Sequence, residues 1–308
     1  MKLNSILIAF DENYFETGEV MLYSLSKNSA QSFKIHFFYH EMSDHSLNEL
    51  AQMIEKINKK TGKTNELFLY DIGALKWDLP TMQHWSMQVY FRLLAPEYIL
   101  EDKVLYLDPD IIVQRSIDEL FETDMNGVGF LMCEDCDSSI HKRRLSIPAE
   151  YIYCNSGVIL MNLAYLREIK FTDLISEWLK MGGRELLECP DQDIINGVAY
   201  DKIKYADKIL YNCWPAIATK ETKVIHYICG GFNKPWAGLP PHWRIWWRYA
   251  KECEIACWQS RYIHKNIRDI VSLRMPYEFI VWKIPAIRRF RISIHRKMSS
   301  LFRTGSTS

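Results

Sequence analysis

Short apolar runs alternate with segments of helical periodicity through the first 230 residues of the chain. The runs have the length of buried strands, and the segments between them repeat apolar side chains every three or four residues, as helices with one buried face do. The pattern predicts strands at residues 6–10, 33–39, 67–70, 104–107, 127–133 and 158–161 and helices at residues 16–27, 43–60, 87–95 and 174–181. Such alternation is typical of an α/β fold in which helices cover a mostly parallel sheet.

Three local signals indicate where predicted helices begin or end. The Ser43 hydroxyl can cap the helix that follows it. Pro96 is predicted to stop the helix at residues 87–95, because proline lacks the N–H that a continuing helix needs. Gly182-Gly183 is predicted to end the helix at residues 174–181.

The charge of the chain changes sign near its last quarter. The formal net charge is zero, but residues 1–241 carry 24 Lys and Arg against 34 Asp and Glu, whereas residues 242–308 carry 14 against 4. Prolines and a glycine within residues 235–241 separate the two parts. We therefore predict a domain of residues 1–240 and a basic, aromatic, helical region of residues 241–308.

The basic region interleaves apolar side chains with its cations, including Arg244, Arg248, Arg288 and Arg289. The apolar residues are Trp243, Trp246, Trp247, Tyr249, Phe279, Ile280, Val281, Trp282, Ile284 and Ile287. A helix lying in an anionic membrane interface has this composition, because its cations meet headgroups while its rings sit at the acyl boundary. We predict that the region attaches to the inner membrane surface and binds no nucleic acid. A solvated basic cap or a nucleic-acid surface is the alternative interpretation.

No stretch of the sequence has the length of a membrane-spanning helix. The first apolar run ends at Phe10, too short for a secretory core, and no run reaches the roughly 18 apolar residues of a span. We expect a cytoplasmic protein, peripheral at the cytoplasmic face of the membrane. Its eight cysteines are expected to be reduced thiols.

Two acids one residue apart, Asp108 and Asp110, lie between the apolar runs at residues 104–107 and 111–113. Alternate side chains of an extended chain share a face, so both carboxylates can aim at one ion. Open α/β sheets bind ligands outside the carboxyl ends of their strands, and carboxylates there suit Mg²⁺ or Mn²⁺ carrying a phosphorylated substrate. The pair predicts a divalent-cation site, with an acidic turn as the alternative.

Polar groups further along the chain could complete such a site. His226 is expected on or just past a strand, and an imidazole beside two carboxylates shifts the preference toward Mn²⁺. Lys234 can neutralise a phosphate, and Gly230-Gly231 would let backbone approach it. Asp191-Gln192 precedes an apolar segment and could equally be the polar start of a helix. The sequence has no Walker loop and no complete dinucleotide fingerprint, so metal and side chains would have to hold a diphosphate.

Taken together, these motifs resemble glycosyltransferase family 8, the retaining sugar-nucleotide transferases that include lipopolysaccharide glucosyl- and galactosyltransferases. The resemblance covers roughly residues 4–236, and six motifs occur in the family's order. They are Ala9-Phe10-Asp11-Glu12-Asn13-Tyr14, residues 90–96, Tyr106-Leu107-Asp108-Pro109-Asp110, residues 155–163, residues 191–196, and His226-Tyr227 to Lys234-Pro235-Trp236. The resemblance implies a GT-A fold, with a Rossmann-like, mostly parallel sheet flanked by helices.

The resemblance also implies roles for particular residues. Family members bind Mn²⁺, which bridges the donor diphosphate, at positions matched here by Asp108, Asp110 and His226. Nucleoside-binding positions are matched by Ala9, Asp11, Asn13 and Tyr14. Sugar-binding positions are matched by Arg92, Asn155, Asp191 and Gln192, and phosphate-binding positions by Lys234 with Gly230 or Gly231. An acid near donor and acceptor is matched by Asp135 or, as second choice, Glu134.

The implied activity is transfer of glucose or galactose from a UDP-sugar to a saccharide or glycolipid acceptor, as in lipopolysaccharide or capsule synthesis. Breaking the anomeric bond leaves an oxocarbenium-like sugar and anionic UDP, so Asp191 and the Gln192 carbonyl can favour the cationic centre. Since no carboxylate nucleophile is identifiable, we predict same-face attack with the β-phosphate as base. The alternatives are a haloacid-dehalogenase-type phosphatase, which Ile112 and the late position of the acids disfavour, and a non-catalytic sugar-nucleotide- or glycan-binding protein of the same fold.

Overall fold

The structure is a computed structural model, and it describes residues 3–80, 86–228, 233–238 and 240–255. The chain divides into two compact units, one of residues 1–213 with 218–226 and the other of residues 214–217 with 227–308. The domain boundary predicted at residue 240 lies C-terminal to residue 226, where the larger unit ends, and it stays a prediction. Most of the predicted basic region, from residue 256 onward, lies outside the described residues.

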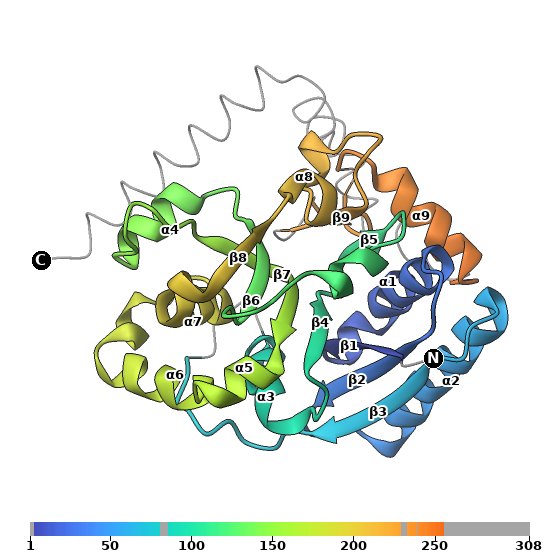
Figure 1. Cartoon of the computed structure of the whole chain (residues 1–308). Helices are drawn as coiled ribbons and strands as arrows, with labels where there is room; N and C mark the ends of the chain where they lie inside the picture. The colour runs from blue at the N-terminus through green and yellow to red at the C-terminus, as the bar shows by residue number, and fades with distance from the viewer. Residues whose placement is uncertain (1–2, 81–85, 229–232, 239, 256–308) are drawn as a thin grey trace, which may run out of the picture. The chain divides into compact units, whose positions relative to one another are not determined.

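A seven-stranded sheet in the order β3-β2-β1-β4-β7-β6-β8 forms the centre of the larger unit (Figure 1). Its strands are β1 (Asn4–Ala9), β2 (Phe33–Tyr39), β3 (Glu66–Asp71), β4 (Lys103–Leu107), β6 (Phe130–Glu134), β7 (Cys154–Asn162) and β8 (Ile203–Ala206). All neighbours are parallel except β7, which runs antiparallel to both β4 and β6. The predicted α/β class with a mostly parallel sheet is therefore confirmed.

A two-stranded antiparallel ribbon of β5 (Ile111–Val113) and β9 (Val224–His226) lies beyond the carboxyl end of β4. Its register sets Ile111 opposite His226, although the two residues are far apart in sequence. All six residues of the ribbon are buried. The ribbon therefore fixes His226 next to the acids that precede β5.

Helices and short 3₁₀ segments connect the strands of the larger unit. The α-helices are α1 (Phe15–Asn28), α2 (Asp44–Thr61), α3 (Ala95–Tyr98), α4 (Ser138–Arg144), α5 (Leu163–Glu168), α6 (Phe171–Lys180), α7 (Pro190–Ala199) and α8 (Lys208–Tyr211). The 3₁₀ segments are η1 (Glu12–Tyr14), η2 (Met87–Leu94), η3 (Asp118–Glu122), η4 (Gly183–Leu186) and η5 (Tyr200–Lys202). As predicted, Ser43 caps α2, accepting the Ser46 N–H at 3.1 Å.

The prediction that Pro96 ends a helix is wrong. Residues 87–94 form the 3₁₀ segment η2, and α3 begins at Ala95 with Pro96 in its first turn. Proline is tolerated there because the N–H groups of a first turn have no partner inside the helix. The strand predicted at residues 158–161 is also longer, since β7 begins at Cys154.

One apolar core fixes the segments that carry the site. Segment η2 packs on α7, and α7 packs on β7. Phe91, Ile159, Ile194 and Ile195 are buried in the same cluster. Between Leu131 and Cys133 of β6 the pairing with β7 loses register, and such irregularities re-aim side chains near functional sites.

The smaller unit contains η6 (Pro215–Ile217) and α9 (Trp243–Glu252). Trp246 is fully buried, with its ring centre 5.3 Å from that of Trp236. Tyr249 is also buried, so only Trp243 and Trp247 among the aromatic residues of α9 have exposed area. Across the described ranges, no helix is long and apolar enough to cross a membrane.

Candidate active site and metal centre

Asp108 and Asp110 flank Pro109 between β4 and β5, and His226 ends β9. His226 Nε2 lies 3.0 Å from Asp110 Oδ1 and 3.5 Å from Asp108 Oδ2. One ligand atom of each residue lies within 4.8 Å of the other two. The structure thus brings together the three residues that the sequence predicts as metal ligands.

The chemistry of this donor set fits a divalent cation. His226 Nδ1 lies 2.8 Å from Asn212 Oδ1, and because an amide oxygen only accepts, Nδ1 carries the proton. Nε2, which lies beside the two carboxylates, is therefore the ring nitrogen left to bind a metal together with them. Two carboxylate oxygens and one imidazole nitrogen suit Mn²⁺ or Mg²⁺.

Gly157 of β7 packs directly against the cluster. Its carbonyl accepts the Asp108 N–H at 2.9 Å, which ties the acidic turn to β7. A Cβ on Gly157 would lie 2.1 Å from His226 Cε1 and 2.8 Å from Asp108 Oδ2. Only a residue without a side chain leaves room for the side chains of His226 and Asp108.

Arg92 links the acidic turn to α7. Its guanidinium lies 3.0 Å from Asp108 Oδ1 and 3.2 Å from Asp191 Oδ2, and it donates to the Ser156 carbonyl at 2.7 Å. The guanidinium also stacks 3.8 Å from the centre of the Tyr106 ring, whose hydroxyl donates to Asp108 Oδ1 at 2.7 Å. This buried cation therefore holds the two acids on either side of it in fixed positions.

A cluster of amides and one acid lies beside this ion pair. Asn155 Nδ2 donates to Gln192 Oε1 at 3.0 Å and to Asp135 Oδ2 at 3.2 Å. Glu134, the alternative to Asp135, forms an ion pair with Lys208 instead. The predicted sugar-facing residues Asn155 and Gln192 thus lie together with Asp135.

The predicted nucleoside-binding residues follow the carboxyl end of β1. β1 is parallel to β4, and their register brings Ala9 level with Asp108 at the same edge of the sheet. Asp11 accepts the Asn13 N–H at 3.0 Å, and Tyr14 is half-buried. Their nucleoside role stays a prediction.

The predicted phosphate-binding residues belong to the smaller unit. Lys234 Nζ donates to the Tyr227 carbonyl at 2.6 Å and lies 5.7 Å from the centre of the Trp236 ring. Gly230 and Gly231 lie outside the described residues. The phosphate role of Lys234 and the two glycines stays a prediction.

Burial raises the pKa of the Asp191 carboxyl from 3.8 to about 6, although the Arg92 guanidinium opposes this shift. The folded state therefore binds the Asp191 proton more tightly than the unfolded state does. The resulting stability is fully present below about pH 4 and is lost as the pH rises through about 6. At neutral pH the carboxylate is ionised.

We expect the stability of the wild-type protein relative to Asp191→Asn to rise on acidification. Asparagine does not titrate, so the wild type should gain about 1.4 kcal/mol relative to the variant between pH 8 and pH 5. Urea unfolding of both proteins with a chelator measures this difference. If the difference in free energy of unfolding between the two proteins were the same at both pH values, the raised pKa of Asp191 would be contradicted.

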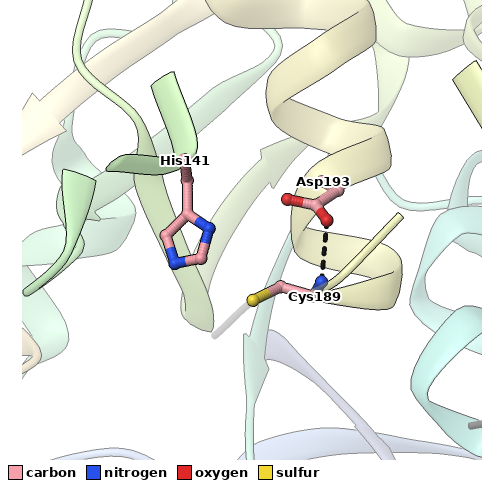
Figure 2. Close-up of side chains that lie close together, drawn as sticks. All are labelled: His141, Cys189 and Asp193. Atoms are coloured by element: carbon pink, nitrogen blue, oxygen red, sulfur yellow. Dashed lines mark hydrogen bonds between the residues drawn. The ribbon is translucent and has the colours of Figure 1, made fainter. Parts of the chain in front are cut away.

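A second cluster, not predicted from the sequence, contains His141, Cys189 and Asp193 (Figure 2). Arg144 already occupies it, lying 2.7 Å from Asp193 Oδ1 and 3.0 Å from His141 Nδ1. Asp193 also accepts the Cys189 N–H at 2.7 Å, and burial raises the pKa of the Cys189 thiol to about 12. The contacts of Arg144 with His141 and Asp193, together with the raised pKa of the Cys189 thiol, argue for a structural role of this cluster at the start of α7.

The larger unit thus combines a mostly parallel sheet covered by helices with two carboxylates and an imidazole at its strand ends, as the motifs predict. The sequence profile of glycosyl transferase family 8 matches residues 5–239, and the chain belongs to this family. The protein is therefore a glycosyltransferase, as predicted.

Two relatives show how far the similarity extends. The chain is 27% identical over 303 residues to lipopolysaccharide 1,2-glucosyltransferase of Escherichia coli, covering 93% of this chain and 84% of that protein. It is 27% identical over 253 residues to lipopolysaccharide 1,3-galactosyltransferase of Salmonella typhimurium, covering 75% and 72%. The matches therefore span most of both enzymes.

Solved structures share the fold. Galactosyltransferase LgtC, in complex with donor and acceptor sugar analogues, superposes with a TM-score of 0.65 at 23% identity, covering 81% of this chain and 95% of LgtC. The glycosyltransferase GlyE of Streptococcus pneumoniae superposes with a TM-score of 0.63 at 21% identity, covering 88% of this chain and 64% of GlyE. The predicted GT-A fold is confirmed.

Proposed function

We propose that the protein transfers glucose or galactose from a UDP-sugar to a saccharide or glycolipid acceptor, with retention of configuration and with Mn²⁺ or Mg²⁺. The observation that carries this proposal is the cluster of Asp108, Asp110 and His226, with His226 Nε2 3.0 Å from Asp110. The lipopolysaccharide glucosyl- and galactosyltransferase relatives support a hexose donor and an acceptor of the lipopolysaccharide type.

The surrounding residues have complementary charges for this reaction. A bound divalent cation would neutralise the diphosphate that departs from the sugar. Arg92 keeps Asp108 directed toward the metal position and Asp191 on its other side. The ionised Asp191 can stabilise positive charge on the sugar, because that charge develops in a buried site where electrostatic interactions are strong.

The proposed retention proceeds by same-face attack. Gln192 Oε1 accepts from both Asn155 Nδ2 and the Ser156 N–H, each at 3.0 Å. With both lone pairs engaged, this oxygen is a poor nucleophile. The acceptor hydroxyl would attack the anomeric carbon and pass its proton to the β-phosphate of the departing UDP. Isolation of a glycosylated Asp191 or Gln192 intermediate would overturn this proposal.

The donor assignment predicts UDP release from one hexose donor. Purified protein incubated with Mn²⁺ and either UDP-glucose or UDP-galactose should release UDP at least about tenfold faster from one of them. Chelation of the metal should abolish this release, and added Mn²⁺ should restore it. Absence of release from either donor, with a lipopolysaccharide acceptor present, would contradict the proposed function.

We also propose that residues 241–308 hold the protein at an anionic membrane surface. Arg244, Arg248 and Lys251 of α9 are exposed, and their spacing puts them on one helix face. Each basic residue near such a surface contributes about 1 kcal/mol. Replacing all three by glutamate should therefore weaken binding to anionic vesicles at least about a hundredfold.

Vesicle sedimentation at low salt measures this effect. The matched control replaces Lys59, Lys60 and Lys63, near the end of α2, by glutamate, which changes the net charge equally. If the α9 variant and the wild type sedimented alike, the membrane proposal would be wrong.

A further inference from the structure

A continuous series of hydrogen bonds begins at the metal-ligand imidazole and leads into the amide cluster. His226 Nδ1 donates to Asn212 Oδ1, and Asn212 Nδ2 donates to Asn155 Oδ1, each at 2.8 Å. Asn155 Nδ2 then donates to Gln192 Oε1 at 3.0 Å. Gln192 Nε2 donates to the Tyr153 hydroxyl at 3.0 Å, so every donor in the series points the same way.

Two backbone groups fix the direction of the series. The Gly157 N–H donates to Asn155 Oδ1 at 2.9 Å, and the Ser156 N–H donates to Gln192 Oε1 at 3.0 Å. A backbone N–H can only donate, so the oxygens of both side-chain amides must face these groups. Asn155 Oδ1 can therefore only accept from Asn212, which turns the oxygen of Asn212 toward His226.

The backbone of Asn212 is held against the strand that carries His226. The neighbouring Cys213 N–H donates to the Val224 carbonyl, and the His226 N–H donates to the Cys213 carbonyl, each at 3.0 Å. The side chain therefore has a fixed starting point beside the imidazole. Asn212 belongs to none of the six motifs, and it is the C-cap residue of α8.

We propose that Asn212 is a positioning residue that sets the tautomer of His226 and couples the metal ligand to the amides facing the donor sugar. The identities of metal and donor rest on the proposed function. Asn212 acts through two separable hydrogen bonds: its oxygen keeps the proton on His226 Nδ1, and its N–H₂ group orients Asn155. Without the oxygen, the proton can move to Nε2, where it blocks metal ligation.

Two variants separate these effects. In Asn212→Leu the new side chain has a size similar to asparagine but makes no hydrogen bond to His226 or Asn155. The Mn²⁺ affinity of this variant should therefore fall about 10- to 100-fold. Asn212→Asp still accepts from His226 Nδ1 but offers no N–H to Asn155. Its Mn²⁺ affinity should equal or exceed that of the wild type, while the KM for the UDP-sugar rises about tenfold.

Electron paramagnetic resonance of free Mn²⁺ measures the affinity without catalysis. The control is Asn58→Leu, because the half-buried Asn58 also makes one accepted and one donated hydrogen bond, both to Asn65 at 2.9 Å. This variant should bind Mn²⁺ as the wild type does. Circular dichroism checks that each variant is folded.

Several outcomes would overturn the role of Asn212. A folded Asn212→Leu variant with the Mn²⁺ affinity of the wild type would contradict it. An Asn212→Asp variant whose Mn²⁺ affinity falls as far as that of Asn212→Leu would also contradict it. ¹⁵N NMR of the wild type tests the tautomer without any substitution, and a neutral His226 protonated on Nε2 would contradict the proposal. A wild-type protein that binds no Mn²⁺ would instead overturn the proposed function together with this inference.

Discussion

Replacement of Asp110 by asparagine is expected to slow sugar transfer about a thousandfold, equivalent to about 4 kcal/mol of transition-state stabilisation. Asparagine keeps the size of the side chain but removes the charge that lies 3.0 Å from His226 Nε2. A metal held by one carboxylate and one imidazole would bind weakly and would offset less of the charge on the departing diphosphate. Initial rates at saturating donor and a parallel Mn²⁺ titration measure both effects.

The control for this variant is Asp118→Asn. Asp118 accepts hydrogen bonds from Ser29 Oγ at 2.6 Å and from the Ala30 N–H at 3.0 Å, and these bonds lower its pKa against the effect of burial. Its replacement should reduce the free energy of unfolding by about 1 kcal/mol and leave transfer unchanged. Transfer and Mn²⁺ affinity in Asp110→Asn that match the wild type would show that this acid holds no metal.

Gly157→Ala should reduce Mn²⁺ affinity and transfer at least about a hundredfold. The added methyl group would lie 2.1 Å from His226 Cε1 and 2.6 Å from Nδ1, so the imidazole must move away from the two carboxylates. The backbone around Gly157 belongs to β7 and is held by its neighbours, so the ligand rather than the strand should give way. Calorimetric titration with Mn²⁺ and initial-rate measurements detect the two losses.

Gly129→Ala is the matched control for overpacking. A Cβ there would lie 2.7 Å from Leu166 Cδ2, an apolar side chain outside the metal cluster. This variant should lower the free energy of unfolding by about 1–3 kcal/mol and keep the Mn²⁺ affinity of the wild type. Equal loss of metal binding in both variants would show that general destabilisation, not displacement of His226, causes the effect.

The sequence predicted those parts of the fold that show clear apolar periodicity. The strands β1 and β2 fall close to their predicted bounds because each is a short run of mostly buried residues. The helix α2 does so because its buried residues repeat at helix spacing. Helix α4 carries four basic or histidine residues and only one aliphatic residue, Ile140, so it has no apolar stripe to detect. Pro96 begins a helix and does not end one, and local sequence does not distinguish these two roles of proline.

Site residues that belong to sequence motifs were predictable. Those whose role depends only on tertiary packing were not. Asp108 and Asp110 are visible as a pair and His226 through its own motif, and the β5–β9 pairing brings His226 beside the acids from a distant part of the chain. Asn212 gave no signal, because a lone asparagine after a short helix has no pattern of its own. The need for glycine at position 157 is likewise set by the packing of His226 against β7.

The proposed metal centre is tested most directly by anomalous diffraction from crystals grown with Mn²⁺ and UDP. The expected result is a manganese peak coordinated by one oxygen from Asp108, one oxygen from Asp110 and Nε2 of His226, with diphosphate oxygens completing the coordination. A nucleotide bound in the same crystals without manganese at these three residues, or with manganese bound elsewhere, would contradict it.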